Sequence, residues 1–272
     1  MFKLHTNSPS QAALILFGVP KHFDLIWKAY MQNLVLQNPG TQFRIYFHYY
    51  EDLTSITNVK NAEIDIDVQS LEVIESILTG IDYTVITSNQ SEFDKTINWL
   101  VDDHADKFEF TLETARNMFR QSNSLRLAYN EAAIHSPDVY IFARSDTFLA
   151  DKLVLPKVAD GEIYIPQWHG WPGIEVNDRF SVCSRGAAKI YARKGEAYEK
   201  YVKEKSYVHN PERMLRWWLI ENNVTFWEMG DEIEHLWAPL LRVRGNGKVP
   251  ARDASTFKAK NVEDLKKILL NT

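Results

Sequence analysis

An arginine and an aspartate directly follow an apolar stretch in the middle of the chain. Residues 139–143 read VYIFA, a β-branched and aromatic run without helical periodicity, and Arg144, Ser145 and Asp146 come next. Such a run predicts a buried strand. Because open α/β sheets bind ligands beyond the carboxyl ends of their strands, Arg144 and Asp146 would stand at the mouth of a site. A guanidinium and a carboxylate there could hold a phosphate group and a divalent metal ion, and they could equally form a plain strand-end ion pair.

A second cationic cluster lies near the C-terminus, in the stretch LRVRGNGK at residues 241–248. In an extended strand, Arg242 and Arg244 point to the same side, where they could clamp a departing phosphate. A charged hydrogen bond of this kind contributes about 1.5–3 kcal/mol. The alternative is an exposed edge strand whose basic residues discourage aggregation.

Two indoles and an imidazole, those of Trp168, His169 and Trp171, occupy a glycine-bounded loop. Loops carry binding groups more often than core strands do, and exposed indoles are costly without a partner. Stacking on a sugar ring would explain them, and so would folding back onto the core. We favour the sugar-binding interpretation.

The surrounding pattern predicts an α/β fold. Residues 12–18, 23–36 and 43–49 read as strand, helix and strand, the start of a parallel sheet. This alternation continues to residue 149, and shorter elements follow. Strands are expected at 83–86, 162–166, 179–184 and 224–229, and helices at 71–78, 92–135 (interrupted), 184–204, 211–221 and 261–270. We expect one domain, residues 1–272, with two functional halves, 1–150 and 151–272.

Composition narrows the class of protein. The chain has 272 residues, 45% hydrophobic and 25% charged, which are ordinary globular values. A formal net charge of −5 argues against a nucleic-acid partner. The single cysteine cannot form an internal disulfide, the N-terminus is polar, and no apolar run approaches bilayer length. These features predict a soluble, cytoplasmic protein without a membrane span.

Five short motifs, taken in order, resemble a known family. They are LILFGVP (14–20), QSNSLRLAYN (121–130), FARSDTFL (142–149), NDRFSVCSR (177–185) and HNPERMLRWWLIENNV (209–224). In this order they resemble nucleotide-sugar glycosyltransferases of the GT-A fold, in particular small ones of large DNA viruses and bacteria. The resemblance spans nearly the whole chain. It implies a Rossmann-like, mixed and mostly parallel sheet flanked by helices, with the nucleotide sugar in the first half and the acceptor in the second.

The same resemblance implies roles on the donor side. Gly18 and Val19 would face the nucleotide, and Arg126 would reach the diphosphate, although it could also lie on a solvated helix face. The family's metal motif, Asp-x-Asp, falls on Arg144-Ser145-Asp146. Its first acid is therefore an arginine here. Either Asp146 binds Mn²⁺ or Mg²⁺ together with donor oxygens and water, or the donor is held mainly by arginines.

On the acceptor side, Asp178 is the candidate base. Inverting transfer needs a carboxylate to take the proton from the attacking hydroxyl, whereas a retaining enzyme would not need this base. Asp178 follows the tryptophan loop and precedes a strand, although it could also cap a turn, and Glu175 and Asp231 are weaker candidates. Arg179 and the loop residues Trp168, His169 and Trp171 would contact the acceptor.

The expected function is that of a hexosyl- or pentosyltransferase. It would move a sugar from a UDP-linked donor to a glycan hydroxyl by inverting displacement, with a pentose such as xylose as one candidate sugar. The alternative is a non-catalytic carbohydrate-binding or assembly protein on a decayed transferase fold. A nucleotidyltransferase ranks last, because the loop FGVPKHF has one glycine where such enzymes usually have a glycine- and lysine-rich loop.

Overall fold

The computed structural model describes residues 9–53, 55–58, 63–108, 111–166, 173–205, 210–229, 240–250 and 258–271. Within these ranges, seven strands form one sheet in the order β10-β8-β9-β6-β1-β2-β5. Strand β9 runs antiparallel to both of its neighbours, and every other neighbouring pair is parallel. The strands are β1 (Gln11–Phe17), β2 (Gln42–Tyr50), β5 (Tyr83–Ser88), β6 (Val139–Arg144), β8 (Glu162–Pro166), β9 (Phe180–Cys183) and β10 (Thr225–Met229).

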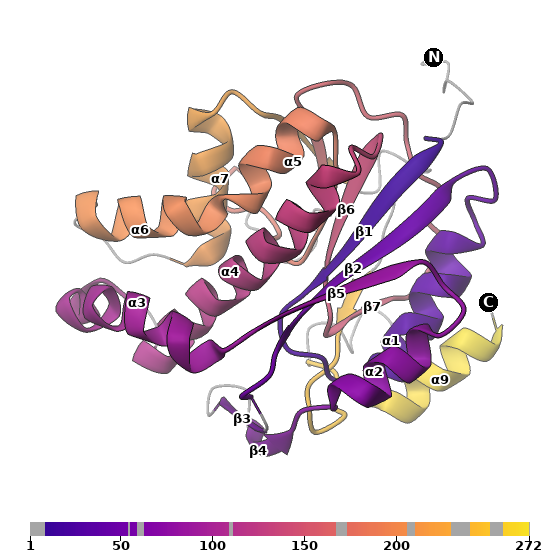
Figure 1. The fold of residues 1–272 in the computed structure, drawn as a ribbon, viewed down its shortest axis with the longest axis horizontal. Helices are drawn as coiled ribbons and strands as arrows, with labels where there is room; N and C mark the ends of the chain where they lie inside the picture. The colour runs from indigo at the N-terminus through magenta and orange to yellow at the C-terminus, as the bar shows by residue number, and fades with distance from the viewer. Residues whose placement is uncertain are drawn as a thin grey trace.

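Helices cover both faces of this sheet (Figure 1). One face carries α1 (Phe23–Tyr30), continued by a π-helical turn (Met31–Val35), with α2 (Leu71–Leu78) and α9 (Val262–Asn271). The other face carries α4 (Leu112–Ile134), α5 (Arg185–Ala192) and α7 (Pro211–Glu221). Outside α4 lie α3 (Gln90–Asp103), a short 3₁₀ turn (Ala105–Lys107) and α6 (Lys194–Glu204).

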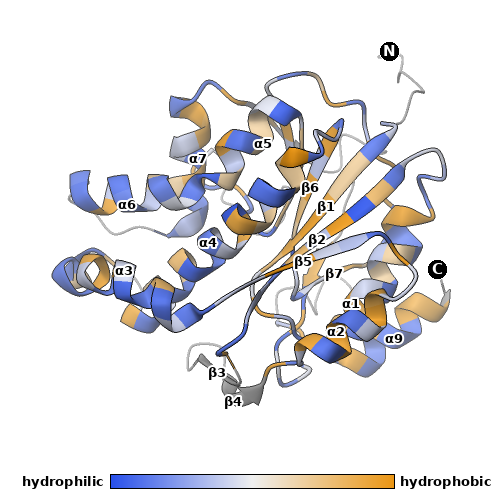
Figure 2. Ribbon diagram, viewed as in Figure 1, coloured by the Kyte–Doolittle hydropathy of each residue, from blue (hydrophilic) through white to orange (hydrophobic). Residues whose placement is uncertain are grey.

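Side-chain alternation along β1 explains the layering. Successive residues of a strand point to opposite faces, and both faces of β1 are apolar. Ala12, Leu14 and Leu16 pack in the cluster that holds α1, whereas Ile15 and Phe17 pack toward α4 and α5. Central strands buried on both faces are typical of parallel sheets under two helical layers. Figure 2 shows the apolar strands in the middle and helices whose outward sides are polar.

The expected fold class is confirmed. The structure has the mixed, mostly parallel, Rossmann-like sheet flanked by helices that the sequence predicts. Strands β8, β9 and β10, from the second half of the chain, extend the sheet beside β6. The division into a donor-binding and an acceptor-binding half stays a prediction.

Two features differ from expectation. The helix expected over 184–204 is two helices, because Arg193 leaves the helical conformation (φ −92°, ψ 15°) and Gly195 follows. Two small antiparallel pairs were not foreseen as pairs: β3 (Ser55–Asn58) with β4 (Glu63–Asp67), and β7 (Thr147–Leu149) with β11 (Leu240–Arg242).

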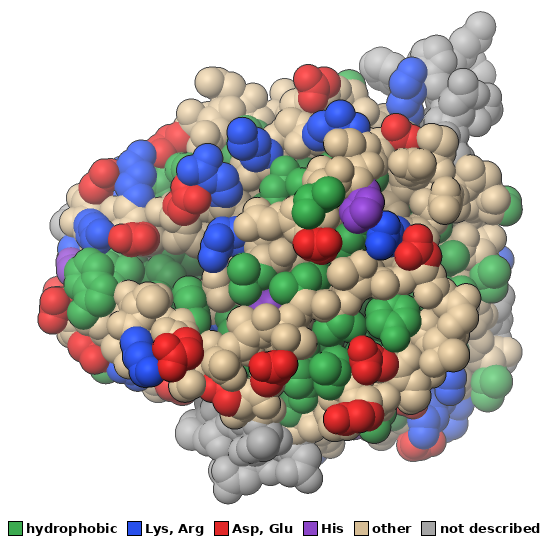
Figure 3. Space-filling view, viewed as in Figure 1, with side chains coloured by type: hydrophobic (Ala, Val, Ile, Leu, Met, Phe, Trp, Pro, Cys, Tyr) green, Lys and Arg blue, Asp and Glu red, His purple; other side chains and the backbone are tan. Residues whose placement is uncertain are grey.

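The surface in Figure 3 carries Lys and Arg side chains interspersed with Asp and Glu. This mixture agrees with the formal net charge of −5. Among the helices that the structure describes, none is long and apolar enough to cross a membrane.

Candidate functional site

A pocket lies where the order of the strands reverses. The chain passes from β1 to β2 and β5 on one side, and β6 then pairs with the other side of β1. Open α/β sheets bind ligands at such a switch point, beyond the carboxyl ends of the strands. The pocket measures about 60 Å³ and is lined by Gly18, Val19, Lys21, Tyr50, Gln90, Asn117, Arg120, Gln121, Arg144, Asp146 and Arg242.

The size of the pocket limits what enters it. Pockets for whole small-molecule ligands measure roughly 300–1,000 Å³. The space at the switch point, about 60 Å³, is several times smaller. It suits one compact charged group, such as a phosphate, while the rest of a larger ligand would extend outside. Four of its lining side chains are cationic and one is a carboxylate, so an anion is the ligand that its charge favours.

Gly18 forms the turn that opens the pocket at the end of β1. Its φ is +84°, in the left-handed region that glycine adopts without steric cost. Its N–H donates to the Ser124 hydroxyl at 3.1 Å, which ties the turn to α4. The loop that follows brings Val19 and Lys21 to the pocket wall.

Asp146 lies between two arginines. Its Oδ1 accepts from Arg144 Nε at 3.0 Å, and its Oδ2 accepts from Arg144 Nη2 at 2.8 Å. The Oδ2 atom also accepts from Arg242 Nε at 3.1 Å. The β7–β11 pair delivers Arg242, which stands opposite Thr147, and the Val243 N–H donates to the Asp146 carbonyl at 2.9 Å.

The charges around Asp146 determine its protonation. Burial alone would raise the pKa of this carboxyl, but Arg144, Arg242 and Lys21 hold its pKa below the usual range. The pKa of Arg144 is raised in spite of burial, because the charges of Asp146 and Asp178 favour the guanidinium. Asp146 and Arg144 are therefore both charged at neutral pH.

A divalent metal does not fit this donor set. Mg²⁺ and Mn²⁺ sites use carboxylate oxygens together with phosphate and water, but both oxygens of Asp146 already accept from arginine. A divalent ion about 4 Å from a guanidinium would meet repulsion on the order of 8 kcal/mol at an effective dielectric of about 20. In the part of the chain that the structure describes, no three His, Cys, Asp or Glu side chains are placed to hold a metal.

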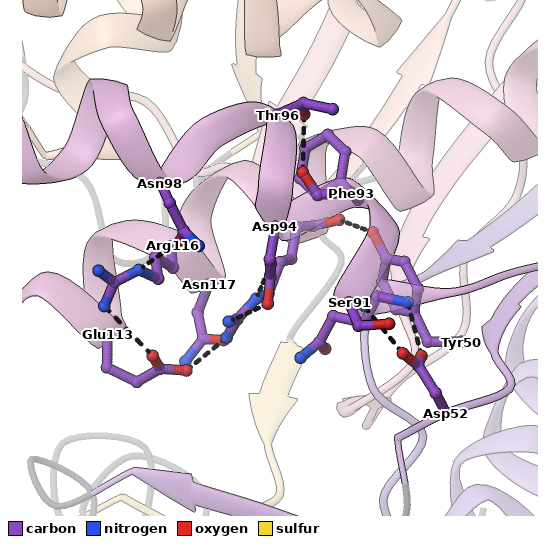
Figure 4. Close-up of polar contacts among 12 residues, drawn as sticks. Tyr50, Asp52, Ser91, Phe93, Asp94, Thr96, Asn98, Glu113, Arg116 and Asn117 are labelled. Atoms are coloured by element: carbon purple, nitrogen blue, oxygen red, sulfur yellow. Dashed lines mark hydrogen bonds and ion pairs between the residues drawn. The ribbon is translucent and has the colours of Figure 1, made fainter.

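Arg120 reaches the pocket from α4 and is held by a polar network. Figure 4 labels its partners Asp94, Glu113 and Asn117. The Arg120 guanidinium donates to both oxygens of Asp94, at 2.8 and 2.7 Å, to Asn117 at 2.8 Å, and to Glu113. The Tyr50 hydroxyl donates to the Arg120 carbonyl at 3.0 Å. Because its charge is balanced within the network, Arg120 contributes shape and hydrogen bonding more than net charge.

The end of β2 anchors the same network. The carboxylate of Asp52 accepts from the N–H groups of Gln90 and Ser91, at 2.6 and 2.8 Å (Figure 4). These are the first residues of α3, whose positive helix end favours a carboxylate. Helix α3, which supplies Asp94, is thereby fixed to the sheet beside the pocket.

A second group of buried charges lies next to the pocket, around Asp178. Lys194 Nζ and the Tyr191 hydroxyl both donate to the Asp178 carbonyl, each at 3.1 Å. Burial and then the charge of Asp178 raise the pKa of Glu212, in the first turn of α7, to about 7. Burial lowers the pKa of Lys194 to about 8, against the opposing charge of Asp178. The break after α5 places Lys194 at the start of α6, where it is almost completely buried.

Glu175, the weaker candidate base, is engaged elsewhere. Its Oε1 accepts from Asn210 Nδ2 at 2.6 Å and from Arg213 Nη2 at 3.4 Å. Asn210 in turn caps α7, accepting from the Arg213 N–H at 2.8 Å. Glu175 therefore helps to fix the start of the helix that carries Glu212.

The structure brings five predicted donor-side residues together: Gly18, Val19, Arg144, Asp146 and Arg242 all line the pocket. Arg179, expected beside the acceptor, is close to them, because its carbonyl accepts from the Arg144 N–H at 2.9 Å. Burial and the charges of Arg242 and Arg144 lower the pKa of Arg179.

Two predicted donor-side residues lie elsewhere. Arg244 follows the end of β11, and its backbone carbonyl accepts from the Gly247 N–H in a turn. It does not line the pocket. Arg126 is exposed, donates to Asn123 Oδ1 at 2.8 Å, and lines a separate hollow of about 350 Å³ between α3, α4 and α6. Trp168, His169, Trp171 and Asp231 lie outside the described residues.

Sequence reasoning missed Lys21, Arg120, Lys194 and Glu212. Lys21 follows the Gly18 turn by three residues, so its place at the strand end could have been inferred. Glu212 stood out only as an acid near a helix start, next to Pro211. Arg120 and Lys194 carry no local signal, because their positions depend on how α4 and α6 pack.

Comparison with known proteins identifies no family. No protein-family model matches the sequence. No curated protein matches it either. Among solved structures, the fold is similar to mouse xyloside xylosyltransferase 1 in its apo form, with a TM-score of 0.42 and 12% sequence identity over 81% of this chain and 85% of that chain.

Replacing Asp146 should be strongly destabilising. Asp146→Asn leaves Arg144 buried with its positive charge uncompensated, so we expect the free energy of unfolding to fall by about 3–5 kcal/mol in urea titrations. Because the folded-state pKa is depressed, the stability that Asp146 gives is present above pH ~4 and lost as pH falls below it, so the variant should lack this acid-dependent component. Exposed Asp151→Asn should change stability by less than about 0.5 kcal/mol. Equal stability of Asp146→Asn and wild type would contradict the buried ion pair.

Replacing Glu212 should stabilise the protein at high pH. A folded-state pKa of about 7 means that folding favours protonated Glu212, so stability declines as pH rises from about 4.5 through 7. Glu212→Gln should match wild type near pH 5 and exceed it at pH 8 by on the order of 2 kcal/mol, measured by urea unfolding at both pH values. Glu204→Gln, on the exposed side of α6, is the control. A Glu212→Gln effect that does not change with pH would rule out the raised pKa.

Proposed function

We propose that this chain is a glycosyltransferase that uses a nucleotide-sugar donor. The observation that carries the proposal is the cationic, phosphate-sized pocket at the switch point, next to the buried Asp178 and the half-buried Glu212. An anion site and a carboxylate base on adjoining walls are what displacement of a diphosphate by a hydroxyl requires. The order of sequence motifs supports the same proposal.

One phosphate of the donor's diphosphate would occupy the pocket, and the rest of the donor would extend outside it, with the nucleoside on the side of Gly18 and Val19. Arg144 links the two groups of residues, since it lines the pocket and its pKa is raised by the charges of Asp178 and Glu212. The sugar would therefore lie between the diphosphate and these acids. From the motif resemblance we propose a UDP-linked donor, a hexose or a pentose such as xylose.

In the proposed reaction, Asp178 takes the proton from a glycan hydroxyl. The hydroxyl oxygen then forms a bond to the anomeric carbon of the donor, while the bond from that carbon to the diphosphate oxygen breaks. The electron pair leaves with the diphosphate, whose charge is stabilised by Lys21, Arg144 and Arg242. Attack opposite the leaving group inverts the anomeric centre. Glu212, whose pKa is raised to about 7 by burial and the charge of Asp178, is the other carboxyl that could take the proton.

Arg179 and the loop residues Trp168, His169 and Trp171 remain the proposed acceptor contacts, and cytoplasmic location stays a prediction. The competing function, a carbohydrate-binding protein without turnover, predicts glycan affinity that ignores nucleotides.

A thermal-shift screen tests the proposed function. UDP, GDP and their sugars are each added to the whole protein, and the matching nucleotide should raise the midpoint of unfolding, because a ligand that binds only the folded state stabilises it. Slow hydrolysis of the matching nucleotide sugar without acceptor should accompany the shift. A protein that no nucleotide stabilises, but that binds glycans, would be the non-catalytic alternative.

Asp178→Asn should separate chemistry from donor binding. With the proposed base removed, transfer should fall by roughly 10²–10⁴-fold, while the Kd for the donor stays within about two-fold. Exposed Asp103→Asn, on α3, serves as the control and should transfer normally. If Asp178→Asn transfers at the wild-type rate and Glu212→Gln does not, Glu212 is the base.

A further inference from the structure

The charge around Asp146 has a specific value. Lys21, Arg144 and Arg242 all line the pocket, and all three act electrostatically on Asp146. The formal charges of these three cations and one carboxylate, taken by themselves, sum to +2. A divalent metal would bring the same charge to a diphosphate.

The geometry gives Asp146 a different task from that of a metal ligand. Its two oxygens hold the Arg144 guanidinium in a bidentate pair, and one of them also holds Arg242. The carboxylate is 3% exposed, so it is shielded from solvent behind the arginines. Paired guanidiniums of fixed orientation are well suited to phosphate oxygens, because their planar N–H groups match the spacing of those oxygens.

The residue at position 144 decides between the two modes of binding. An acid there would leave two carboxylates at the strand end and invite a cation. Arg144 instead supplies positive charge itself, and it pairs with the remaining acid, Asp146. The pocket's other lining side chains with hydrogen-bonding groups, such as Asn117 and Gln121, are neutral amides or a phenol, apart from the charge-balanced Arg120.

We propose that this chain binds the diphosphate of its donor directly on Lys21, Arg144 and Arg242, without a divalent metal ion. Asp146 is a positioning residue that orients the two arginines. This inference rests on the proposed function, which supplies the diphosphate, but it makes a separate prediction. Binding of the diphosphate must persist when metal ions are removed.

Calorimetric titration of the whole protein tests whether the diphosphate binds without a metal ion. Pyrophosphate, UDP and GDP are titrated in EDTA, and then in buffer with Mn²⁺ in excess over the ligand. We expect pyrophosphate and one nucleotide to bind in EDTA, with Kd values that Mn²⁺ changes by less than about three-fold. Binding that requires Mn²⁺, or that Mn²⁺ tightens further than this, overturns the inference and leaves the proposed function intact. Binding in neither buffer overturns both.

A matched pair of variants locates the binding. Arg242→Gln should weaken pyrophosphate binding in EDTA by roughly ten-fold or more, because it removes one charged donor while Arg144 still pairs with Asp146. Arg44→Gln removes an arginine near the start of β2, which pairs with Asp82 at the opposite end of the sheet, and should change the Kd by less than about two-fold. Unfolding midpoints confirm that both variants are folded at the temperature of titration. Equal effects of the two substitutions would overturn the assignment to this pocket.

Discussion

The buried ion pair between Arg144 and Asp146 is the interaction on which the site depends. Neither charge would be tolerated alone at the end of a central strand, because an uncompensated buried ion costs several kcal/mol. Together they let β6 end in charged residues without unfolding the sheet around them. The pair also fixes where further cations gather, since Arg242 and Lys21 are drawn to the same carboxylate.

The rest of the molecule supports this pair from several directions. The turn at Gly18 starts the loop that follows β1, beside β6. The hydrogen bond from the Gly18 N–H to the Ser124 hydroxyl ties this turn to α4. The Arg120 network then joins α3, α4 and the end of β2 into one wall. On the other side, the break between α5 and α6 places Lys194 under Asp178. The anion pocket and the acid group are thus separate clusters that share Arg144 as a common neighbour.

Sequence reasoning found the parts of this site that have local signals. The strand, its Arg-Ser-Asp end and the Gly18 turn are readable because strand periodicity and glycine conformation are local properties. On α4, sequence reasoning named Arg126 and missed Arg120. Six residues at 3.6 per turn place the two side chains about 120° apart around the helix axis, and which of them faces the pocket depends on how α4 packs.

Other parts depend on tertiary packing and could not be foreseen. Arg242 was selected for its spacing from Arg244, but only the pairing of β11 with β7 separates their roles. Lys194 looked like an ordinary surface lysine of a long helix, and its burial follows from a break in that helix. The raised pKa of Glu212 reflects burial beside Asp178, 34 positions away in the numbering of the chain.

The pairing of β7 with β11 also bears on how the protein acquires its site during folding. Arg242 reaches Asp146 across 96 residues of sequence, whereas Arg144 reaches it across two. A contact between distant segments requires closure of a long loop, which costs conformational entropy before the contact contributes any stability. Such contacts therefore tend to form late in folding. A chain still being synthesised could already contain every strand of the main sheet and yet lack Arg242, which lines the anion pocket. Competence to bind would then be the last property the folding chain gains.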